Sequence, residues 1–199
     1  MGRHFVHLVR HGQYDYSVKG KLGGSLNAVG REQAHYTSEA LSEFQFNALH
    51  SSTMLRALAT AAIIAGPHQG LKIRRTRMLW ECVPTIPPRW IDFFERRAMR
   101  DPDFTPERVA AQKKVADRAF DRFFTPWKRK KDRHSILVAH GNIIRYLLCK
   151  ALDVDPDAWG NMMIFHCSIS RVVVDPDGSM MLLSHNETGH LPSFLRTDS

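Results

Sequence analysis

The pattern of apolar and polar positions divides the chain into short strands and longer helices. Runs rich in β-branched and aromatic residues predict strands at 5–9, 46–50, 71–75, 135–139, 169–174 and 180–184. Apolar residues at helical spacing predict helices at 27–44, 54–65 and 143–152 and two more within 89–132. The nearly pure apolar run 135–139 is typical of a central strand in a sheet covered on both faces.

Residues that favour helix starts and turns separate these segments. Three helices are expected to begin with a capping side chain. The caps are Asn27, one residue of the stretch Ser51-Ser52-Thr53, and Asn142. The sequence Asp175-Pro176-Asp177-Gly178 predicts the turn of a late hairpin. Gln33 falls on the apolar face of its helix, so we expect its amide to have buried partners.

Length and composition indicate one soluble domain. A chain of 199 residues with 43% apolar and 24% charged residues fits a single domain over 1–199. Within it, 89–132 is expected to be a helical excursion beside the site, and 186–199 an irregular, mobile tail. No apolar run approaches the length of a membrane span, and we see no signal peptide at Met1.

The cysteines indicate the cellular compartment of the protein, and the net charge indicates which partners it could bind. Three cysteines without CxxC spacing indicate a reducing compartment, so we expect a cytoplasmic protein. The net charge of +8 suits an anionic substrate or simple solubility, and without a nucleic-acid motif we expect no nucleic-acid partner. The basic run 128–133 is either a solvated loop or a docking patch for an acidic partner.

Candidate chemistry follows two of the predicted strands. Arg10-His11-Gly12 comes directly after 5–9, and Gly12 can adopt backbone angles that end a strand sharply. The same order, apolar strand, His, Gly, returns at His140-Gly141. Ligands of open α/β sheets bind at such carboxyl ends, although two exposed polar residues after a strand would look the same.

Two more charged residues stand beside predicted elements. Arg56 falls in the first turn of a helix, where the helix dipole already favours anions and a guanidinium adds a planar fork for phosphate. Glu81 is a single carboxylate among apolar residues, and burial would raise its pKa toward that of a general acid. Each could instead be an ordinary surface residue.

Together these residues suit phosphoryl transfer. Two arginines and a histidine can hold phosphoryl oxygens, a neutral histidine can attack phosphorus, and a carboxylic acid can protonate the leaving oxygen. A metal site is not expected, because no HExxH or paired-ligand signature is present.

The motifs resemble those of the histidine phosphatase superfamily, which has the phosphoglycerate mutase-like fold. Their order and spacing match over about 4–185. The matching motifs are Arg10-His11-Gly12, Ser51-Ser52-x-x-x-Arg56-Ala57-x-x-Thr60-Ala61, Leu79-x-Glu81 and Val138-Ala139-His140-Gly141. A closer similarity is to mitochondrial serine/threonine protein phosphatases of phosphoglycerate-mutase type, through Gln13-Tyr14, Pro84, Pro87-Pro88, His140-x-Asn142-x-Ile144-Arg145-Tyr146 and Glu187-Thr188-Gly189-His190-Leu191-Pro192.

The resemblance implies a three-layer α/β/α sandwich with a mostly parallel central sheet, and a metal-independent phosphatase without a cofactor. It implies that His11 is the nucleophile that forms a phosphohistidine, and that Glu81 protonates the leaving group and then activates water. Arg10, Arg56 and His140 would bind the phosphoryl group.

Two departures from the family pattern matter. Ser17 stands where many members have an asparagine, so no phosphate-binding role is assigned to it. The N-terminal anchor and oligomerisation segment of the mitochondrial enzymes have no counterpart in the sequence, so we expect no membrane partner and do not carry over a mitochondrial location. A homodimer is one assembly that the sequence allows.

Three functions remain open. The first is hydrolysis of phosphoserine or phosphothreonine in proteins, with basic residues near 89–100 and 128–133 guiding acidic phosphopeptides. The second is a small-molecule phosphatase or a phosphoglycerate mutase-type phosphotransferase on the same site. The third is a phosphoprotein-binding module without turnover. Cys82, next to Glu81, is a hypothetical site of oxidation sensitivity.

Overall fold

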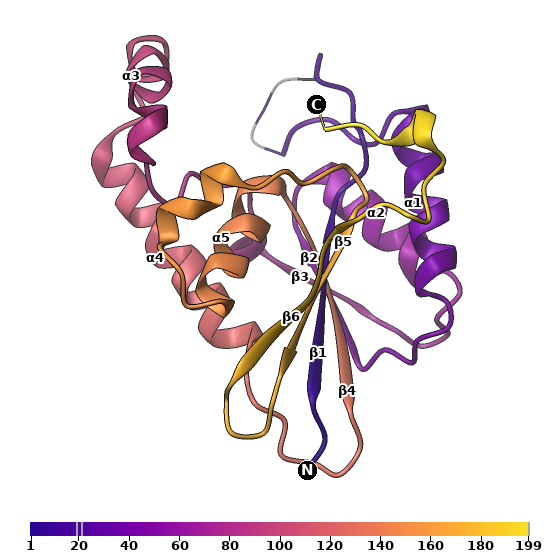
Figure 1. Cartoon of the computed structure of the whole chain (residues 1–199). Coiled ribbons are helices and arrows are strands. Elements are labelled where there is room, and N and C mark those ends of the chain that lie inside the picture. The colour runs from indigo at the N-terminus through magenta and orange to yellow at the C-terminus, as the bar shows by residue number, and fades with distance from the viewer. Residues whose placement is uncertain (19, 21, 199) are drawn as a thin grey trace.

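The computed structural model, which describes residues 1–18, 20 and 22–198, is built on a six-stranded sheet (Figure 1). The strand order is β3-β2-β4-β1-β5-β6. The first four strands in this order are mutually parallel, and β5 and β6 form an antiparallel hairpin beside β1. The strands are β1 (His4–Arg10), β2 (Ala48–Ser52), β3 (Ile73–Thr76), β4 (Arg133–Ala139), β5 (Ile169–Val174) and β6 (Met180–Glu187). The mostly parallel sheet and the late hairpin are therefore confirmed.

Helices cover both faces of this sheet. In Figure 1, α1 and α2 lie on one side and α4 and α5 on the other, while α3 projects beyond the sheet. The helices are α1 (Ala28–Leu41), α2 (Leu55–Ala65), α3 (Ile91–Arg100), α4 (Pro106–Phe123) and α5 (Gly141–Ala151). The three-layer α/β/α architecture is confirmed, and α3 and α4 form the expected helical excursion.

The alternation of side chains along β1 shows why helices must pack against both faces of the sheet. Val6 and Leu8 are buried in the core beneath α4 and α5, whereas Val9 is buried in a second core with Ala57 and Ala61 of α2. Successive residues of a strand point to opposite faces, so a strand that is apolar on both must be central. Each fully buried aliphatic side chain contributes about 1.5–3 kcal/mol.

Only one of the three predicted helix caps is confirmed. Asn27 caps α1, its side chain accepting a hydrogen bond from the Gly30 backbone N–H at 2.8 Å. Ser51 and Ser52 belong to β2 instead, because the strand extends beyond the predicted end. Asn142 lies within the first turn of α5, so the prediction that it is the cap is wrong.

The described part of the C-terminal tail after β6 is largely irregular, as expected, but it packs against the rest of the domain. Leu191 and Leu195 are buried, and a short 3₁₀ turn spans Ser193–Leu195. Gln33 of α1 fastens the tail, since its amide nitrogen donates to the Leu195 carbonyl at 2.7 Å and to Thr197 Oγ1 at 2.9 Å. The buried partners predicted for Gln33 therefore include the tail itself.

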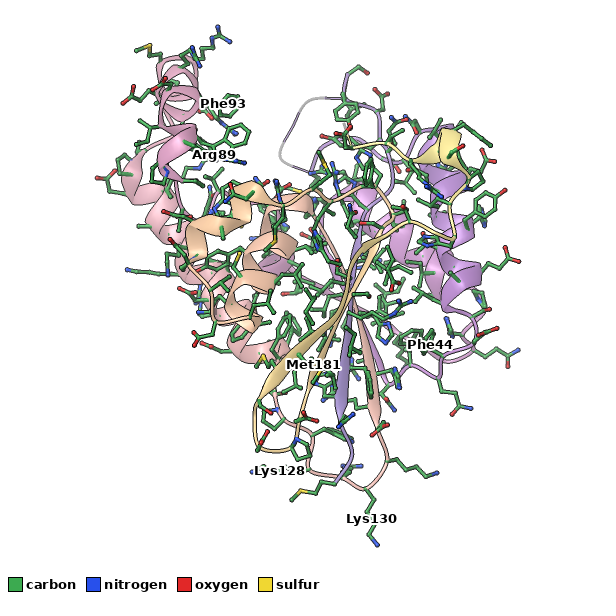
Figure 2. All side chains as sticks on the ribbon, viewed as in Figure 1. Phe44, Arg89, Phe93, Lys128, Lys130 and Met181 are labelled. Atoms are coloured by element: carbon green, nitrogen blue, oxygen red, sulfur yellow. The ribbon has the colours of Figure 1, made fainter. Side chains whose placement is uncertain are left out.

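The fold separates two basic regions that charge alone would group together. Figure 2 shows Arg89 and Phe93 at the end of the molecule that carries α3, and Lys128 and Lys130 at the opposite end. The basic run precedes β4, so it lies at the amino ends of the parallel strands, whereas the candidate site follows their carboxyl ends. The prediction that 128–133 guides substrates to the site is therefore wrong.

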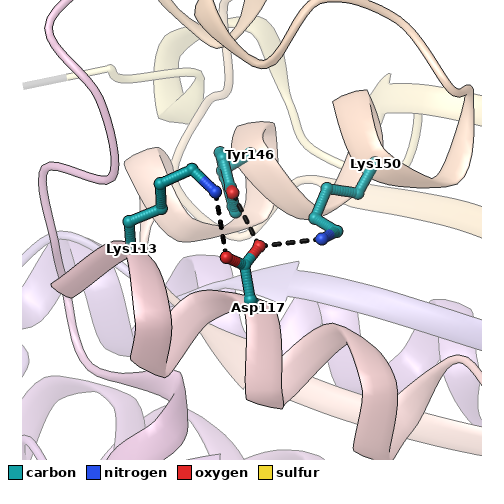
Figure 3. Close-up of polar contacts among 4 residues, drawn as sticks. All are labelled: Lys113, Asp117, Tyr146 and Lys150. Carbon is teal, nitrogen blue, oxygen red and sulfur yellow. Dashed lines mark hydrogen bonds and ion pairs between the residues drawn. The ribbon is translucent and has the colours of Figure 1, made fainter. Parts of the chain in front are cut away.

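An ion cluster at the edge of the helical layer joins α4 to α5 (Figure 3). Asp117 accepts hydrogen bonds from Lys113 at 2.9 Å, Tyr146 at 2.7 Å and Lys150 at 2.8 Å. Desolvation alone would raise the pKa of Asp117, but bonds from Lys150, Lys113 and Tyr146 outweigh it and lower the pKa to about 2. The cluster therefore stabilises the helical layer only while Asp117 is ionised.

Replacing Asp117 by Asn should lower the free energy of unfolding at neutral pH by about 1–2 kcal/mol. Because the folded-state pKa is depressed, this contribution is present above about pH 4 and is lost as the pH falls toward about 2. Urea unfolding of both proteins across this range measures the difference. Asp121→Asn, on the exposed side of α4, is the control, and equal stabilities of Asp117→Asn and wild type at neutral pH would contradict the role.

Candidate active site

His11 lies at the centre of the site, directly after β1, and is only 2% exposed. Its Nδ1 is 2.8 Å from the Gly12 carbonyl oxygen, which can only accept, so Nδ1 carries the proton. The Arg56 Nε–H donates to His11 Nε2 at 3.0 Å, so Nε2 is the unprotonated nitrogen. Two independent contacts thus select one neutral tautomer, with its lone pair on Nε2.

The surroundings of His11 also keep it neutral. Burial lowers its pKa well below the ordinary value, and the nearby charges of His140, Arg56 and Arg10 lower it further. The Gly12 carbonyl opposes this shift but does not reverse it. A positive charge on the imidazole would add to a site that is already cationic, so His11 is neutral at physiological pH.

Helix α2 supplies the guanidinium that faces His11. Arg56 is 7% exposed, and it also lies over the Tyr14 ring at 4.4 Å. Thr60, one turn later, donates to the Arg56 carbonyl at 2.8 Å and accepts the Gly12 backbone N–H at 3.1 Å. The start of α2 is thereby fixed against the loop after β1.

Two further histidines surround His11. The ring of His140, which follows β4, is 4.9 Å from that of His11, and the ring of His166, before β5, is 5.5 Å away. Among the described residues, His140 Nδ1, His166 Nε2 and Arg10 Nε are buried and have no hydrogen-bond partner. Buried polar atoms normally have partners, so these three are suited to bind oxygens of a ligand.

The C-terminal tail reaches the site through Arg10. Its Nη1 donates to the Ile164 carbonyl at 2.6 Å and to the Asp198 carbonyl at 2.9 Å. Thr197 bonds His166, since its carbonyl accepts from the His166 backbone N–H at 2.8 Å and its Oγ1 is 3.0 Å from Nδ1. The tail therefore orients both side chains.

Glu81 enters the site from the segment after β3. Its Oε1 accepts the Cys82 backbone N–H and that of Asn142 in the first turn of α5, each at 3.1 Å. Desolvation raises the pKa of Glu81, although Arg10, the Cys82 N–H, Arg145 and Arg56 act in the opposite direction. The carboxyl group is thus shifted toward its protonated form while the helix start holds its position.

A pocket of about 470 Å³ opens over these groups. Arg56 and Glu81 lie in its wall, whereas His11 and His140 are buried and do not line it. Its other lining residues include two tyrosines from the loop after β1, an arginine from each of α3 and α4, and a phenylalanine between these helices. These residues are Tyr14, Tyr16, Arg97, Phe104 and Arg108.

The structure brings all five predicted residues together, but Gly12 acts differently from the prediction. Its backbone does not adopt a positive φ. A Cβ there would lie 2.4 Å from the Gly30 carbonyl oxygen, so Gly12 is required by the close approach of α1. Steric contact, and not unusual backbone angles, fixes the turn after β1.

Sequence reasoning missed His166 and assigned Arg145 no role. His166 precedes a strand that runs antiparallel to β1, so the amino end of β5 meets the carboxyl end of β1, a relation no local motif reveals. Arg145 donates hydrogen bonds to Asn142 and to the Met162 carbonyl, and its guanidinium stacks on Trp159.

Ser17, to which no phosphate-binding role is assigned, is exposed, and its hydroxyl donates to the Asp15 carboxylate at 2.6 Å.

Cys82 does not have the features of a reactive thiol. It is 8% exposed, and burial together with the Glu81 charge raises its pKa well above the ordinary value. The thiolate is the reactive form, so this environment disfavours oxidation. Cys149, in the apolar core of α5, is fully buried.

The profile of the histidine phosphatase superfamily (branch 1) matches residues 6–188. The chain belongs to this superfamily. Membership supports the prediction of a phosphoric monoester hydrolase.

Within the described residues, no group of three or more His, Cys, Asp or Glu side chains is arranged to hold a metal ion. No helix in 1–18, 20 and 22–198 combines the length and apolar character needed to cross a bilayer.

Among curated proteins, the chain is similar to mitochondrial serine/threonine-protein phosphatases named PGAM5. It is 33% identical over 189 residues to the Xenopus tropicalis protein and 33% identical over 194 residues to that of Caenorhabditis elegans. These matches cover 94% of the chain but only 66% and 64% of the two relatives. The relatives are named as mitochondrial, so the prediction of a plain cytoplasmic location is contradicted.

Solved structures show the same fold. A mutant phosphoserine phosphatase from Entamoeba histolytica, in complex with phosphoserine, superimposes with a TM-score of 0.71 at 19% identity. That match covers 95% of this chain and 100% of the other. A mycobacterial glucosyl-3-phosphoglycerate phosphatase in complex with VO3 gives a TM-score of 0.67 at 26% identity, covering 92% and 99% of the two chains.

Replacing Arg56 by Ala should raise the pKa of His11, because a nearby positive charge is removed and water gains access. Ring resonances of His11, followed by NMR during a pH titration, measure this shift. Arg31→Ala removes an exposed arginine of α1 and is the control. A His11 pKa that is unchanged in Arg56→Ala would contradict the coupling between the two side chains.

Proposed function

We propose that the chain is a metal-independent phosphatase that hydrolyses phosphoserine and phosphothreonine in proteins through a phosphohistidine on His11. The observation that carries the proposal is the neutral tautomer of His11, with Nε2 unprotonated beside the Arg56 guanidinium. A nucleophile needs a free lone pair, and a phosphate ester needs cations around its oxygens. In the structure the Nε2 lone pair accepts the Arg56 N–H, so the substrate takes the place of this bond: Arg56 then donates to a phosphoryl oxygen, and the lone pair becomes available to phosphorus.

Binding of the phosphoryl group is assigned to Arg10, Arg56 and His140, with His166 as an addition to the predicted set. The rings of His140 and His166 lie 4.9 and 5.5 Å from that of His11, and Arg10 precedes His11 in the chain. The unpartnered Arg10 Nε, His140 Nδ1 and His166 Nε2 are assigned as donors to the phosphoryl oxygens. Such donors are fixed before the substrate arrives, so they stabilise the developing charge without reorganisation. The cationic set also supports metal independence, since it would repel a metal ion.

In the first step, His11 Nε2 attacks phosphorus and the bond to the seryl or threonyl oxygen breaks. Glu81 donates its proton to that oxygen, which leaves as an alcohol. In the second step, the ionised Glu81 takes a proton from water as the water oxygen attacks phosphorus, the bond from phosphorus to His11 Nε2 breaks, and inorganic phosphate leaves. The raised pKa of Glu81 makes the first proton transfer feasible near neutral pH.

The walls of the pocket support a peptide as substrate. Arg97 on α3 places positive charge at the rim, where acidic residues beside the phosphorylated one could bind; Asp101 also lines the pocket, and Arg108 on α4 is paired with Asp103 at 3.6 Å. A second, more apolar cavity of about 480 Å³ shares Met54, Glu81 and Cys82 with the first. A substrate larger than a small ester could fill both. The names of the PGAM5 relatives agree with this substrate class.

The same site could serve a small phosphate ester or transfer phosphate within a phosphoglycerate. Product analysis separates these functions. Release of phosphate from phosphopeptides supports the proposal, whereas rapid cleavage of small esters with no phosphopeptide turnover favours the small-molecule function. Conversion of one phosphoglycerate isomer to another would identify a mutase, and phosphate binding without turnover would identify a binding module.

Replacing His11 by Ala should reduce hydrolysis of p-nitrophenyl phosphate in EDTA by at least about 10³-fold, because the nucleophile is removed. Release of p-nitrophenolate is followed by absorbance. His35→Ala, on the exposed side of α1, should retain wild-type activity. Activity that depends on added metal, or that persists in His11→Ala, would rule out the proposed mechanism.

Replacing Glu81 by Gln should slow hydrolysis of a phosphoserine peptide by about 10²–10⁴-fold, because seryl oxygen needs protonation to leave. With p-nitrophenyl phosphate, whose leaving group needs none, a rapid first burst of product should persist while steady turnover slows. Stopped-flow absorbance resolves the two phases. In wild type, peptide cleavage should fall as the pH rises through the raised pKa of Glu81. A variant with no burst would contradict the assignment.

Replacing Arg97 by Ala should raise KM for a phosphopeptide with flanking acidic residues by about fivefold and leave kcat unchanged, because the rim charge acts in binding. Initial rates with this peptide and with p-nitrophenyl phosphate test the expectation. Arg96→Ala, the exposed neighbour on α3, is the matched control. An equal effect on both substrates would show that Arg97 acts on the site itself and not on the peptide.

A further inference from the structure

Another concave site, separate from the two cavities beside Glu81, lies on the face of the sheet that α4 and α5 cover, toward the amino ends of the strands. The cavity measures about 230 Å³ and shares no residue with the catalytic pocket. None of its lining residues carries a carboxylate. They are His4, His50, Arg74, Arg122, Phe123, Thr125, Arg133, Ser135 and Leu137.

The register of the parallel strands explains why these side chains converge. Arg74 of β3 is paired with His50 of β2, and His50 is paired in turn with Leu137 of β4. Arg133 lies four residues before Leu137 and therefore points to the same face. The last turn of α4 closes the site, where the Phe123 ring packs 4.8 Å from that of His50 and Arg122 adds a third guanidinium.

The positive charge of this pocket is not neutralised within the described chain. Arg74, Arg122 and Arg133 form no ion pair there. Arg133 only stacks on the Trp127 ring, at 4.9 Å. Burial lowers the pKa of His50 to about 4, and the next causes are the charges of Arg74, Arg122 and Arg133. Three like charges thus act on one half-buried ring.

We propose that this pocket binds a small phosphate-bearing anion, either free phosphate or the phosphate of a small ester, separately from the catalytic site. Guanidinium groups match the geometry of phosphate oxygens with paired hydrogen bonds. The cavity has room for such a group, since a water molecule occupies only about 30 Å³. An anion held there would remove the repulsion between the three arginines.

The pocket is also joined to the catalytic site by one helix. Arg108 and Gln112, in the first half of α4, line the catalytic pocket, while Arg122 in its last turn lines the anion pocket. A phosphate bound to Arg122 and Arg74 would tie the end of α4 to the sheet edge. The site does not depend on the proposed catalytic function, because it rests on separate residues.

NMR of the histidine rings tests the proposal in the full chain, because His50 and His140 report on the two sites separately. Inorganic phosphate added near neutral pH should shift the His50 resonances saturably and raise the pKa of His50. Arg74→Ala and Arg122→Ala, both exposed positions, should each weaken this binding about tenfold and leave the His140 response unchanged. Arg75→Ala, the next residue of β3, points to the opposite face and should have no effect.

Glycerol phosphate in place of inorganic phosphate distinguishes the two sources. Tighter binding of the ester assigns the site to small phosphate esters, and equal or weaker binding assigns it to free phosphate. A His50 response that does not saturate would indicate an adventitious ion only and overturn the proposal. The proposal is also overturned if His50 does not respond, or if Arg74→Ala and Arg122→Ala bind phosphate as wild type does.

Discussion

The hydrogen bond from Arg56 Nε to His11 Nε2 is the contact on which the chemistry of this protein depends. It works only together with the Gly12 carbonyl, which holds the proton on Nδ1. The Gly12 carbonyl keeps the proton on Nδ1 when Arg56 turns from Nε2 to a substrate oxygen, whereas loss of the Gly12 contact would allow the other tautomer, whose lone pair on Nδ1 faces the backbone. The burial of His11 strengthens both bonds and opposes protonation.

The fold brings Arg56 and His11 together at the edge of the sheet where the parallel strands end. Parallel strands β1, β2 and β4 end there, and the turns after them carry His11, the start of α2 and His140. Thr60 and Gly12 lock α2 and α1 against the first turn, so the site is positioned by packed helices. The tail then fixes Arg10 and His166 from outside the sheet.

Much of this could be predicted from sequence because the signals are local. Strand-end motifs located His11 and His140, and a single carboxylate in an apolar segment identified Glu81. What could not be predicted depends on contacts between distant segments. His166 reaches the site through an antiparallel pairing, and the tail is ordered by a glutamine more than a hundred residues earlier, as the bond from Gln33 to Leu195 shows.

The errors have the same origin. Charge alone allows the basic run 128–133 to be either a solvated loop or a guide for substrates, but strand direction puts it at the end opposite the site, where most of it is exposed. The Asn142 side chain was expected to cap α5, whereas its backbone N–H is bound by Glu81, a residue 61 positions away. In both cases tertiary structure overrides a correct local propensity.

The central claim is that His11 carries the phosphoryl group during turnover. The most direct measurement is mass spectrometry of the enzyme quenched into alkali, which preserves phosphohistidine, during cleavage of a phosphopeptide. Phosphorylation of the peptide that contains His11, absent in His11→Ala, is the result predicted. Continued turnover with the phosphoryl group on another residue would contradict the account. So would the absence of phosphohistidine in Glu81→Gln that is quenched during its burst with p-nitrophenyl phosphate.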